Sequence, residues 1–534
     1  MTYAYSQLLG CAAYNTGETE IFSGVRLIDD HTFSLTIAAD YLPYFYELIY
    51  VNVTPYPIGA IAPGCTVADD GEGAYITALN GEDGNPLGEF TAEVLKQTIL
   101  DPETGYLSNP SVTSGPYALV EYNREEATVS FAANRAYRGD YQGQRPLIDQ
   151  VTLVPVKNAE LLGKLEAGEV DIVNKVSDGS VIAGGMADFA EGLLRVTNYL
   201  RSGLGFVGFA CEEGPTASAN VRKAISHCLD KEALTTAFTD TYGLPVYSYY
   251  GLGQWMTTDY INEMDQHVTV YPLDLDAAAA LLDQDGWTLN EQGGKFVPGT
   301  DLVRYKELEG EELADYQQIA NPIVPAVDVG GKTLLPLSLR FAKLKDSAMT
   351  ELLDQMISEN LRAVGFQLEI VGIEFADMLA HYNRQTDRTY NMFALATNFK
   401  HVFDPYYAFN GAEQYRGELN QSGIDDEELL ELAKALRETT PGDNEGYIER
   451  WLSLMQRYSD LLPTVPIYSN VYFDFIGNHV QNYAPNAHWS WPAALLYTYS
   501  GEPLVLEDLL QLIAVEEVPV EGEAPPEVAP TEGN

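Results

Sequence analysis

Apolar residues recur every three to four positions in several long segments of this chain, and shorter apolar runs lie between those segments. The first pattern predicts helices with one buried face, and the second predicts strands. Residues 218–238 give the clearest helical pattern. Because helices and strands then alternate, we expect an α/β or α+β protein. The other expected helices cover 275–284, 347–364, 376–383, 427–438 and 445–460, and the expected strands cover 335–341, 367–373, 390–396 and a pair within 465–476.

The first third of the chain has a weaker pattern. A hairpin is predicted over 25–37, because two apolar runs flank the turn residues Asp29 and Asp30. Residues 64–113 and 289–334 are rich in Gly, Pro, Asp and Asn, so we expect long irregular loops there. A helix is expected over 91–100, and strands are expected over 117–122, 127–132 and 150–156.

The chain has 534 residues, which is too long for one compact core. Single cores stop growing near about 250–300 residues, so two or more lobes are expected. Apolar residues make up 46% and charged residues 20%, which is typical of a folded protein. No apolar stretch approaches the ~18–20 residues of a membrane-spanning helix. Residues 515–534 are dominated by Pro, Glu and Ala, and we expect a disordered acidic tail there.

The chain is strongly acidic, with 30 Lys and Arg against 78 Asp and Glu and a net charge of −48. A surface of this sign repels phosphate, so nucleic acid and anionic membranes are excluded as expected partners. The charge is interpreted first as a solubility feature, with selection for cationic ligands as the alternative.

Motifs of common catalytic and metal sites are missing from the sequence. The four cysteines form no CxxC pair, and we expect free, mostly buried thiols. None of the seven histidines is spaced i, i+4, so no metal site on a helix is predicted, although histidines could still converge in space. The GxGxxG match at Gly203–Gly208 is interpreted as a glycine-rich strand, because no helix follows it. We therefore expect no cofactor and no catalytic residues.

The densest group of polar and aromatic residues lies in Asn398–Asn410, directly after a predicted buried strand. Loops at strand ends carry many ligand sites, although a turn with aromatic packing explains the same composition equally well. Tyr249, Tyr250 and Trp255 could line a cleft or pack within a loop. The candidate ligand-binding residues are Asn398, Lys400, His401, Asp404, Tyr249, Tyr250 and Trp255.

Four short motifs occur in a fixed order along the chain. They are Ser114–Tyr117 (SGPY), Asn134–Gly139 followed by Pro146–Asp149, Gly168–Ile172 (GEVDI), and Val221–Lys231 (VRKAISHCLDK). Together they resemble the family 5 extracellular solute-binding proteins of ABC importers, the group that binds oligopeptides, dipeptides or nickel.

This resemblance implies a two-lobe α/β fold like that of type II, cluster C periplasmic binding proteins, with strands that cross a hinge. It also implies a monomeric, non-enzymatic receptor outside the cytoplasm, periplasmic or attached to the cell surface. Such a receptor takes a peptide or other small molecule from solution and passes it to ABC permease subunits. Lobe I is expected over 1–205 with 478–505, lobe II over 212–472, and the crossings at 206–211 and 471–477.

Two departures from the family pattern modify this expectation. The family's opening segment has no counterpart, and residues 1–20 contain no secretory signal, although Cys11 follows a short lipoprotein-like sequence. His401 stands where peptide binders carry an Asp that grips the peptide's amino terminus. An imidazole is a poor partner for an ammonium group, so an anionic or neutral ligand becomes plausible. The alternatives are a degenerate sensor or decoy of the same fold and a carboxylate-based hydrolase.

Overall fold

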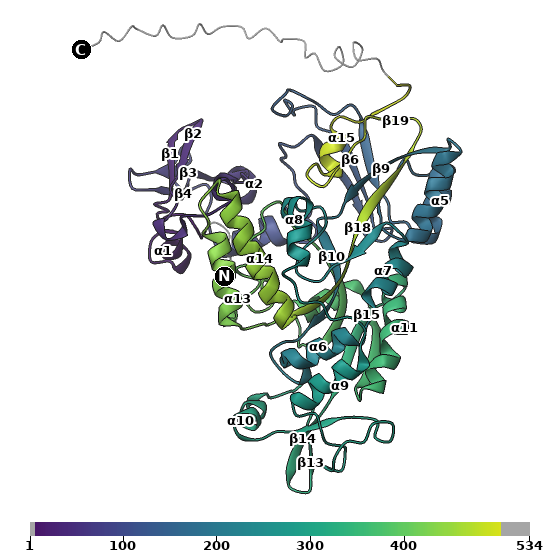
Figure 1. Cartoon of the computed structure of the whole chain (residues 1–534). Coiled ribbons are helices and arrows are strands. Elements are labelled where there is room, and N and C mark those ends of the chain that lie inside the picture. Colours follow the sequence, from purple (N-terminus) through teal and green to yellow (C-terminus); the bar gives the residue numbers. More distant parts are fainter. Residues whose placement is uncertain (1–5, 504–534) are drawn as a thin grey trace, which may run out of the picture.

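A mixed sheet of eight strands forms the centre of the molecule in the computed structural model, which describes residues 6–503 (Figure 1). Two of these eight strands, β8 (Ile172–Val176) and β9 (Leu194–Leu200), pair with one half of the long strand β18. The main order is β11 (Gly243–Pro245), β18 (Thr464–Gly477), β10 (Gly203–Phe209), β17 (Met392–Asn398), β15 (Ser338–Leu344) and β16 (Gln367–Ile373).

The core lies around strand β10, whose seven residues GLGFVGF are all buried. This confirms that the GxGxxG match is a glycine-rich strand. Its first residue, Gly203, lies so close to the carbonyl of Thr397 that an added Cβ would collide with it. Glycine is therefore required where β10 meets β17. Strand β15 runs parallel to β16 and β17, and the helix α11 (Ala348–Ala363) connects β15 to β16.

Strand β18 is a single strand of 14 residues, whereas the sequence predicted a strand pair over 465–476. Its first half pairs with β10 and β11, and its second half pairs with β9 and β8. The change falls at Asn470 and Val471, and the chain passes from β9 to β10 through Arg201 and Ser202. The lobe boundaries given above stay a prediction.

The helix predicted over 218–238 is two helices, α6 (Ala219–His227) and α7 (Lys231–Thr239). The Asp230 carboxylate accepts a hydrogen bond from the backbone N–H of Ala233 at 2.9 Å and so caps α7. The apolar periodicity continues across the break, which is why the pattern hid it. The helices expected over 275–284 and 347–364 are confirmed as α9 (Leu275–Gln284) and α11.

The prediction of a long irregular loop over 289–334 is also wrong. This segment contains a three-stranded sheet and the helix α10 (Gly310–Gln318). The strands are three to five residues long, and the turn residues between them obscured their pattern. The sheet order is β12 (Tyr305–Glu307), β14 (Lys332–Pro336) and β13 (Val327–Val329).

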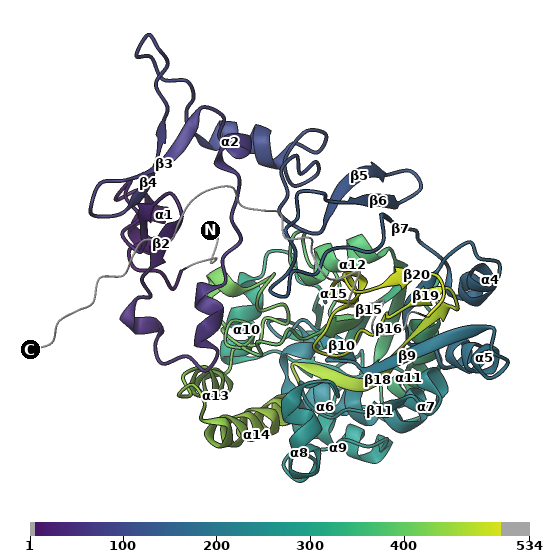
Figure 2. The same cartoon turned by 90° about the horizontal axis from the view of Figure 1, so that it is seen from above.

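The N-terminal elements lie to one side of the central sheet, as Figure 2 shows. The hairpin predicted over 25–37 is confirmed as β1 (Val25–Asp29) and β2 (Thr32–Leu35). A second hairpin, β3 (Cys65–Asp69) with β4 (Ala74–Ala78), lies where a loop was expected. The three-stranded sheet β5 (Tyr117–Asn123), β6 (Thr128–Ala133) and β7 (Gln150–Leu153) matches the strands predicted there.

Eleven further α-helices and two further strands occur in the described residues. The helices are α1 (Cys11–Thr16), α2 (Ile58–Ile61), α3 (Ala92–Leu95), α4 (Leu161–Glu166), α5 (Gly179–Ala190), α8 (Trp255–Asp265), α9 (Leu275–Gln284), α12 (Phe375–Tyr382), α13 (Glu427–Arg437), α14 (Asn444–Leu461) and α15 (Trp491–Leu495). The last strands are β19 (Val480–Gln481) and β20 (Tyr499–Ser500).

Three further expectations concern the whole chain. All four cysteines are buried free thiols, as expected. Within residues 6–503 no helix has both the length and the apolarity needed to cross a membrane. The tail predicted over 515–534 lies outside the described residues.

Candidate functional site

Arg201 lies where β9, β10, β17 and β18 meet, and its guanidinium is hydrogen-bonded to neutral oxygens of three residues. Its Nε donates to Oδ1 of Asn398 at 2.8 Å, and its two terminal nitrogens donate to the Thr397 carbonyl at 3.0 Å and to Oδ1 of Asn470 at 3.3 Å. Arg201 is 5% exposed. Within the described residues it makes no ion pair, so its charge is buried without a neutralising carboxylate.

Tyr472 completes this arrangement from strand β18. Its hydroxyl donates to Oδ1 of Asn398 at 3.2 Å, and the Arg201 guanidinium lies 5.5 Å from its ring centre. Asn398 therefore has its amide oxygen fixed by two donors. The amide Nδ2 of this exposed residue has no hydrogen-bond partner in the described part of the chain. We call Arg201, Asn398 and Tyr472 the Asn398 cluster.

Two lysines lie near this cluster. The Lys175 ammonium is 6.0 Å from the Tyr472 ring centre, and Lys400 is exposed two residues after Asn398. Neither lysine makes an ion pair among residues 6–503. The Asn398 cluster is thus a cationic, hydrogen-bond-donating region in a molecule whose net charge is −48. Such a region favours a carboxylate or carbonyl group of a ligand over an ammonium group.

His401 lies against His488, which the sequence analysis did not single out. Their Nδ1 atoms are 3.3 Å apart, and their ring centres are 5.2 Å apart. Both residues are exposed. His488 lies in the loop that precedes α15, 87 residues further along the chain.

Asp404 is paired with protein groups rather than open to a ligand. Its Oδ2 accepts hydrogen bonds from Nε of Arg437 at 2.9 Å and from the Tyr44 hydroxyl at 3.2 Å. Burial, and secondly the Asp404 charge, raise the pKa of Tyr44. The Arg437 guanidinium also lies 4.4 Å from the ring centre of Tyr406. This geometry favours a role for Asp404 in holding the N-terminal segment against α13.

Of the three predicted cleft aromatics, Tyr249 and Trp255 pack against other aromatic rings, and Tyr250 is buried. The ring of Tyr249 lies 4.8 Å from that of Phe399 and 5.1 Å from that of Tyr458, and burial raises its pKa to about 12. Tyr250 is only 1% exposed. The Trp255 ring lies 5.6 Å from the ring of Tyr447. These positions favour loop packing for all three, and their contact with a ligand stays a prediction.

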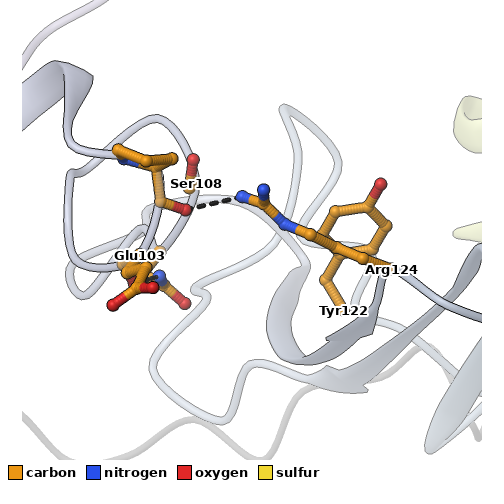
Figure 3. Close-up of a pocket in the computed structure, with 6 residues that line it drawn as sticks. Glu103, Ser108, Tyr122 and Arg124 are labelled. Carbon is orange, nitrogen blue, oxygen red and sulfur yellow. Dashed lines mark hydrogen bonds between the residues drawn. The ribbon is translucent and has the colours of Figure 1, made fainter.

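A separate cavity of about 350 Å³ lies between the loop at Pro102–Asn109 and the turn after β5 (Figure 3). Arg124 reaches across it and donates to the Pro102 carbonyl at 2.6 Å. Its walls also include Glu103 and Tyr122. None of the residues predicted from the sequence to bind a ligand lines this cavity.

The sequence pointed to the 398–404 segment but missed Arg201, Tyr472 and His488. The partners of Asn398 are 197 and 74 positions away from it, and the two histidines are 87 positions apart. No local spacing could reveal those contacts. The one available signal was that Arg201 lies two residues before the glycine-rich strand.

Known proteins resemble this chain over most of its length. The sequence profile described as bacterial extracellular solute-binding proteins, family 5 Middle, matches residues 2–417. Heme-binding protein A of Haemophilus influenzae is 25% identical over 191 residues, 35% of this chain and 31% of that protein. Oligopeptide-binding protein OppA of Lactococcus lactis is 22% identical over 218 residues, 39% of this chain and 34% of that protein. The aligned segments thus span about a third of these relatives.

Solved structures match more of the chain. AppA of Bacillus subtilis, in complex with a nonapeptide, has a TM-score of 0.59 at 14% identity and covers 92% of this chain and 95% of that one. Lactococcal OppA, with an endogenous peptide in the closed conformation, has a TM-score of 0.63 at 14% identity and covers 91% and 78%. Campylobacter jejuni NikZ, in complex with Ni(L-His), has a TM-score of 0.56 at 12% identity and covers 82% and 78%. These matches confirm the expected two-lobe, type II periplasmic-binding-protein-like fold.

Proposed function

The chain belongs to the family 5 bacterial extracellular solute-binding proteins, and from this premise we propose that it captures a peptide or similar small solute between two lobes. It then delivers the solute to the permease subunits of an ABC importer. The observation that carries this proposal is the Asn398 cluster, because it presents hydrogen-bond donors where β9, β10, β17 and β18 meet. Closure of two lobes around such a junction is how hinged receptors retain a ligand.

The chemistry of the cluster supports a solute with a carboxylate or another anionic or carbonyl oxygen. The Asn398 amide nitrogen is the donor that has no other partner in the described part of the chain. Lys175, Lys400 and the buried Arg201 add positive charge, and His401 adds an imidazole donor. Two of the solved structures named above, AppA and lactococcal OppA, hold bound peptides. A peptide whose C-terminal carboxylate faces Asn398 fits both the chemistry of the cluster and the peptides held by these relatives.

The biological setting follows from the same premise. We expect the protein to act as a monomer outside the cytoplasm, without catalysis, with the lobes divided as predicted from the sequence. Binding without chemistry is consistent with a family of solute-binding proteins. A sensor or decoy of this fold would bind the same class of solute without a permease.

A ligand screen tests the proposal. The full chain is unfolded by heat in the presence of short peptides, each with a free or an amidated C-terminus. A ligand that binds only the folded state raises the unfolding midpoint. We expect a rise with free-carboxylate peptides and a smaller rise with their amides.

Substitution of Asn398 tests the position of the ligand. Asn398→Asp replaces the donor by a like charge and should weaken binding of a carboxylate ligand at least tenfold, measured by calorimetry. Asn262→Ala, at an exposed position of α8, is the matched control and should bind normally. Equal affinity of both variants would show that the ligand does not contact Asn398.

A further inference from the structure

The small sheet β5–β6–β7 carries apolar side chains on one of its two faces. Residues that lie directly opposite each other on neighbouring strands project from the same face. Two rows of three apolar residues are formed in this way across the three strands, and a bulge between Leu119 and Glu121 keeps both rows on one side. The six residues are Leu119, Tyr122, Val129, Phe131, Val151 and Leu153. We call them the apolar face.

The opposite face of the same sheet is polar, with Glu121, Ser130 and Thr152 in one row. An antiparallel sheet with this alternation usually packs its apolar side on other residues and exposes its polar side to water. Here no residue of the three strands is buried, and Tyr122 and Leu153 are 51% and 39% exposed. None of the six apolar residues packs against a hydrophobic core of the described chain. The pattern therefore calls for a cover that residues 6–503 do not supply.

We propose that the apolar face is the docking site of residues 504–514 of the same chain, which lie outside the described residues. Eight of these eleven residues, LVLEDLLQLIA, are apolar, whereas residues 516–534 are richest in Glu and Pro. Docking removes apolar side chains of both the segment and the sheet from water, which is favourable. The proposal involves neither the Asn398 cluster nor the solute proposed above.

The described chain ends close to this sheet. The loop that connects β6 to β7 is bonded to the C-terminal segment, because Nε2 of Gln144 donates to the Leu496 carbonyl at 3.2 Å and the Tyr497 hydroxyl donates to the Asp140 carboxylate. Both views show the C-terminal elements next to the sheet (Figure 1 and Figure 2). Pro503 is the last described residue. Eleven extended residues span at most about 36 Å, and a seven-residue strand such as β5 spans about 23 Å. The segment is therefore long enough to cover the sheet from this starting point.

Charge disfavours the other occupants of an apolar face. Two copies of this chain repel each other, since each has a net charge of −48, and an anionic membrane surface is repelled for the same reason. A segment of the same chain is tethered next to the face. Its effective concentration there is high, and it does not lose the translational freedom that a separate partner loses on association.

The rate of thiol labelling of the full chain by a maleimide tests the proposal. Val151→Cys places a thiol on the apolar face, and the four native cysteines are buried and react slowly. Leu509→Asp together with Ile513→Asp puts two charges into the docking segment. Burial of unpaired charges is costly, so these two substitutions should release the segment. We expect them to accelerate labelling of the Val151→Cys thiol at least tenfold.

Two controls separate release of the segment from other effects. Thr152→Cys places a thiol on the polar face, opposite Ser130, and its labelling rate should not respond to the aspartates in the segment. A rate that rises at both positions would mean general unfolding and would count against the proposal. Val518→Asp together with Val520→Asp adds the same charge beyond the segment, and it should leave labelling of the Val151→Cys thiol unchanged.

Circular dichroism of each variant must first match that of the unsubstituted chain, and Leu153→Cys replaces a Val151→Cys variant that fails to fold. Labelling on the apolar face that is unchanged by Leu509→Asp with Ile513→Asp would overturn the proposal. If that unchanged rate also falls as the protein concentration rises, a second copy of the chain covers the face instead.

Discussion

Lys231 is an ionisable residue that lies almost completely buried. It begins α7, is 5% exposed, and its ammonium lies 5.4 Å from the Tyr247 ring centre. Burial lowers the pKa of Lys231 to about 7. An exposed lysine has a pKa of about 10.4. The sequence marked Lys231 only as the last residue of a family motif, because neither spacing nor composition reveals burial of a charge.

We predict that Lys231→Met changes how stability depends on pH. Between about pH 7 and 10.4 the unfolded chain holds a proton on this lysine that the folded chain has released, so its contribution to stability rises with pH. Methionine removes that contribution. The stability gained by the variant in urea unfolding should therefore be largest near pH 7 and shrink toward pH 10.

The exposed Lys434 supplies the control. Lys434→Met should give a difference from the unsubstituted chain that stays within about 0.5 kcal/mol. A Lys231→Met variant whose gain is the same at every pH would show that the ammonium is charged in the folded chain throughout this range.

Arg201 shows at the residue scale why the candidate site was only partly predictable. Asn398 was proposed because it follows a buried strand, and that reasoning used neighbours in sequence. Arg201 holds Asn398 through a contact between residues 197 positions apart. The pairing of β10 with β17 creates this contact, and pairing partners cannot be derived from the pattern of either strand alone.

At the scale of elements, β18 combines buried polar groups with a long ladder of backbone hydrogen bonds. Asp474 is fully buried within it. Its Oδ1 accepts a hydrogen bond from the backbone N–H of Lys175 at 2.7 Å, and its Oδ2 accepts one from the Tyr483 hydroxyl at 2.8 Å. Burial raises the pKa of Asp474, and these two donors oppose that rise.

We predict that Tyr483→Phe destabilises the chain by about 1–3 kcal/mol, because a buried carboxylate oxygen loses its hydrogen-bond donor. The change is measured as a lower midpoint of urea unfolding. Tyr141→Phe is the control at an 85% exposed ring and should have almost no effect. Equal stability of the two variants would mean that water replaces the tyrosine hydroxyl at Asp474.

Element types were predictable where one pattern ran without interruption. The strand predicted over 367–373 and the helix predicted over 347–364 match β16 and α11 closely. Errors arose where local chemistry cut or joined a pattern. The Asp230 cap divided one predicted helix into two, and β18 continued through a point where a turn was expected.

At the scale of the whole molecule, the net charge of −48 is the dominant electrostatic property. Repulsion among like charges opposes the compact state. We predict that the thermal midpoint rises as sodium chloride increases from ~0.01 M to ~1 M, where the screening length falls from ~30 Å to ~3 Å.

Potassium chloride should give the same rise, because screening depends on ionic strength rather than on the cation. A midpoint that stays flat or falls with both salts would show that local ion pairs, such as Arg26 with Asp69 and Arg457 with Asp426, outweigh the repulsion. The sign of the charge was available from composition, whereas these pairings required the fold.

The continuity of β18 limits how the gene of such a protein can recombine during evolution. One strand supplies hydrogen-bond partners to β10 and β11 in its first half and to β9 and β8 in its second. A recombination breakpoint at Asn470 or Val471 would leave each product with an open strand edge, which invites aggregation. The two halves of the sheet are therefore poor modules for domain shuffling, and new specificities should arise by substitution in the loops around them.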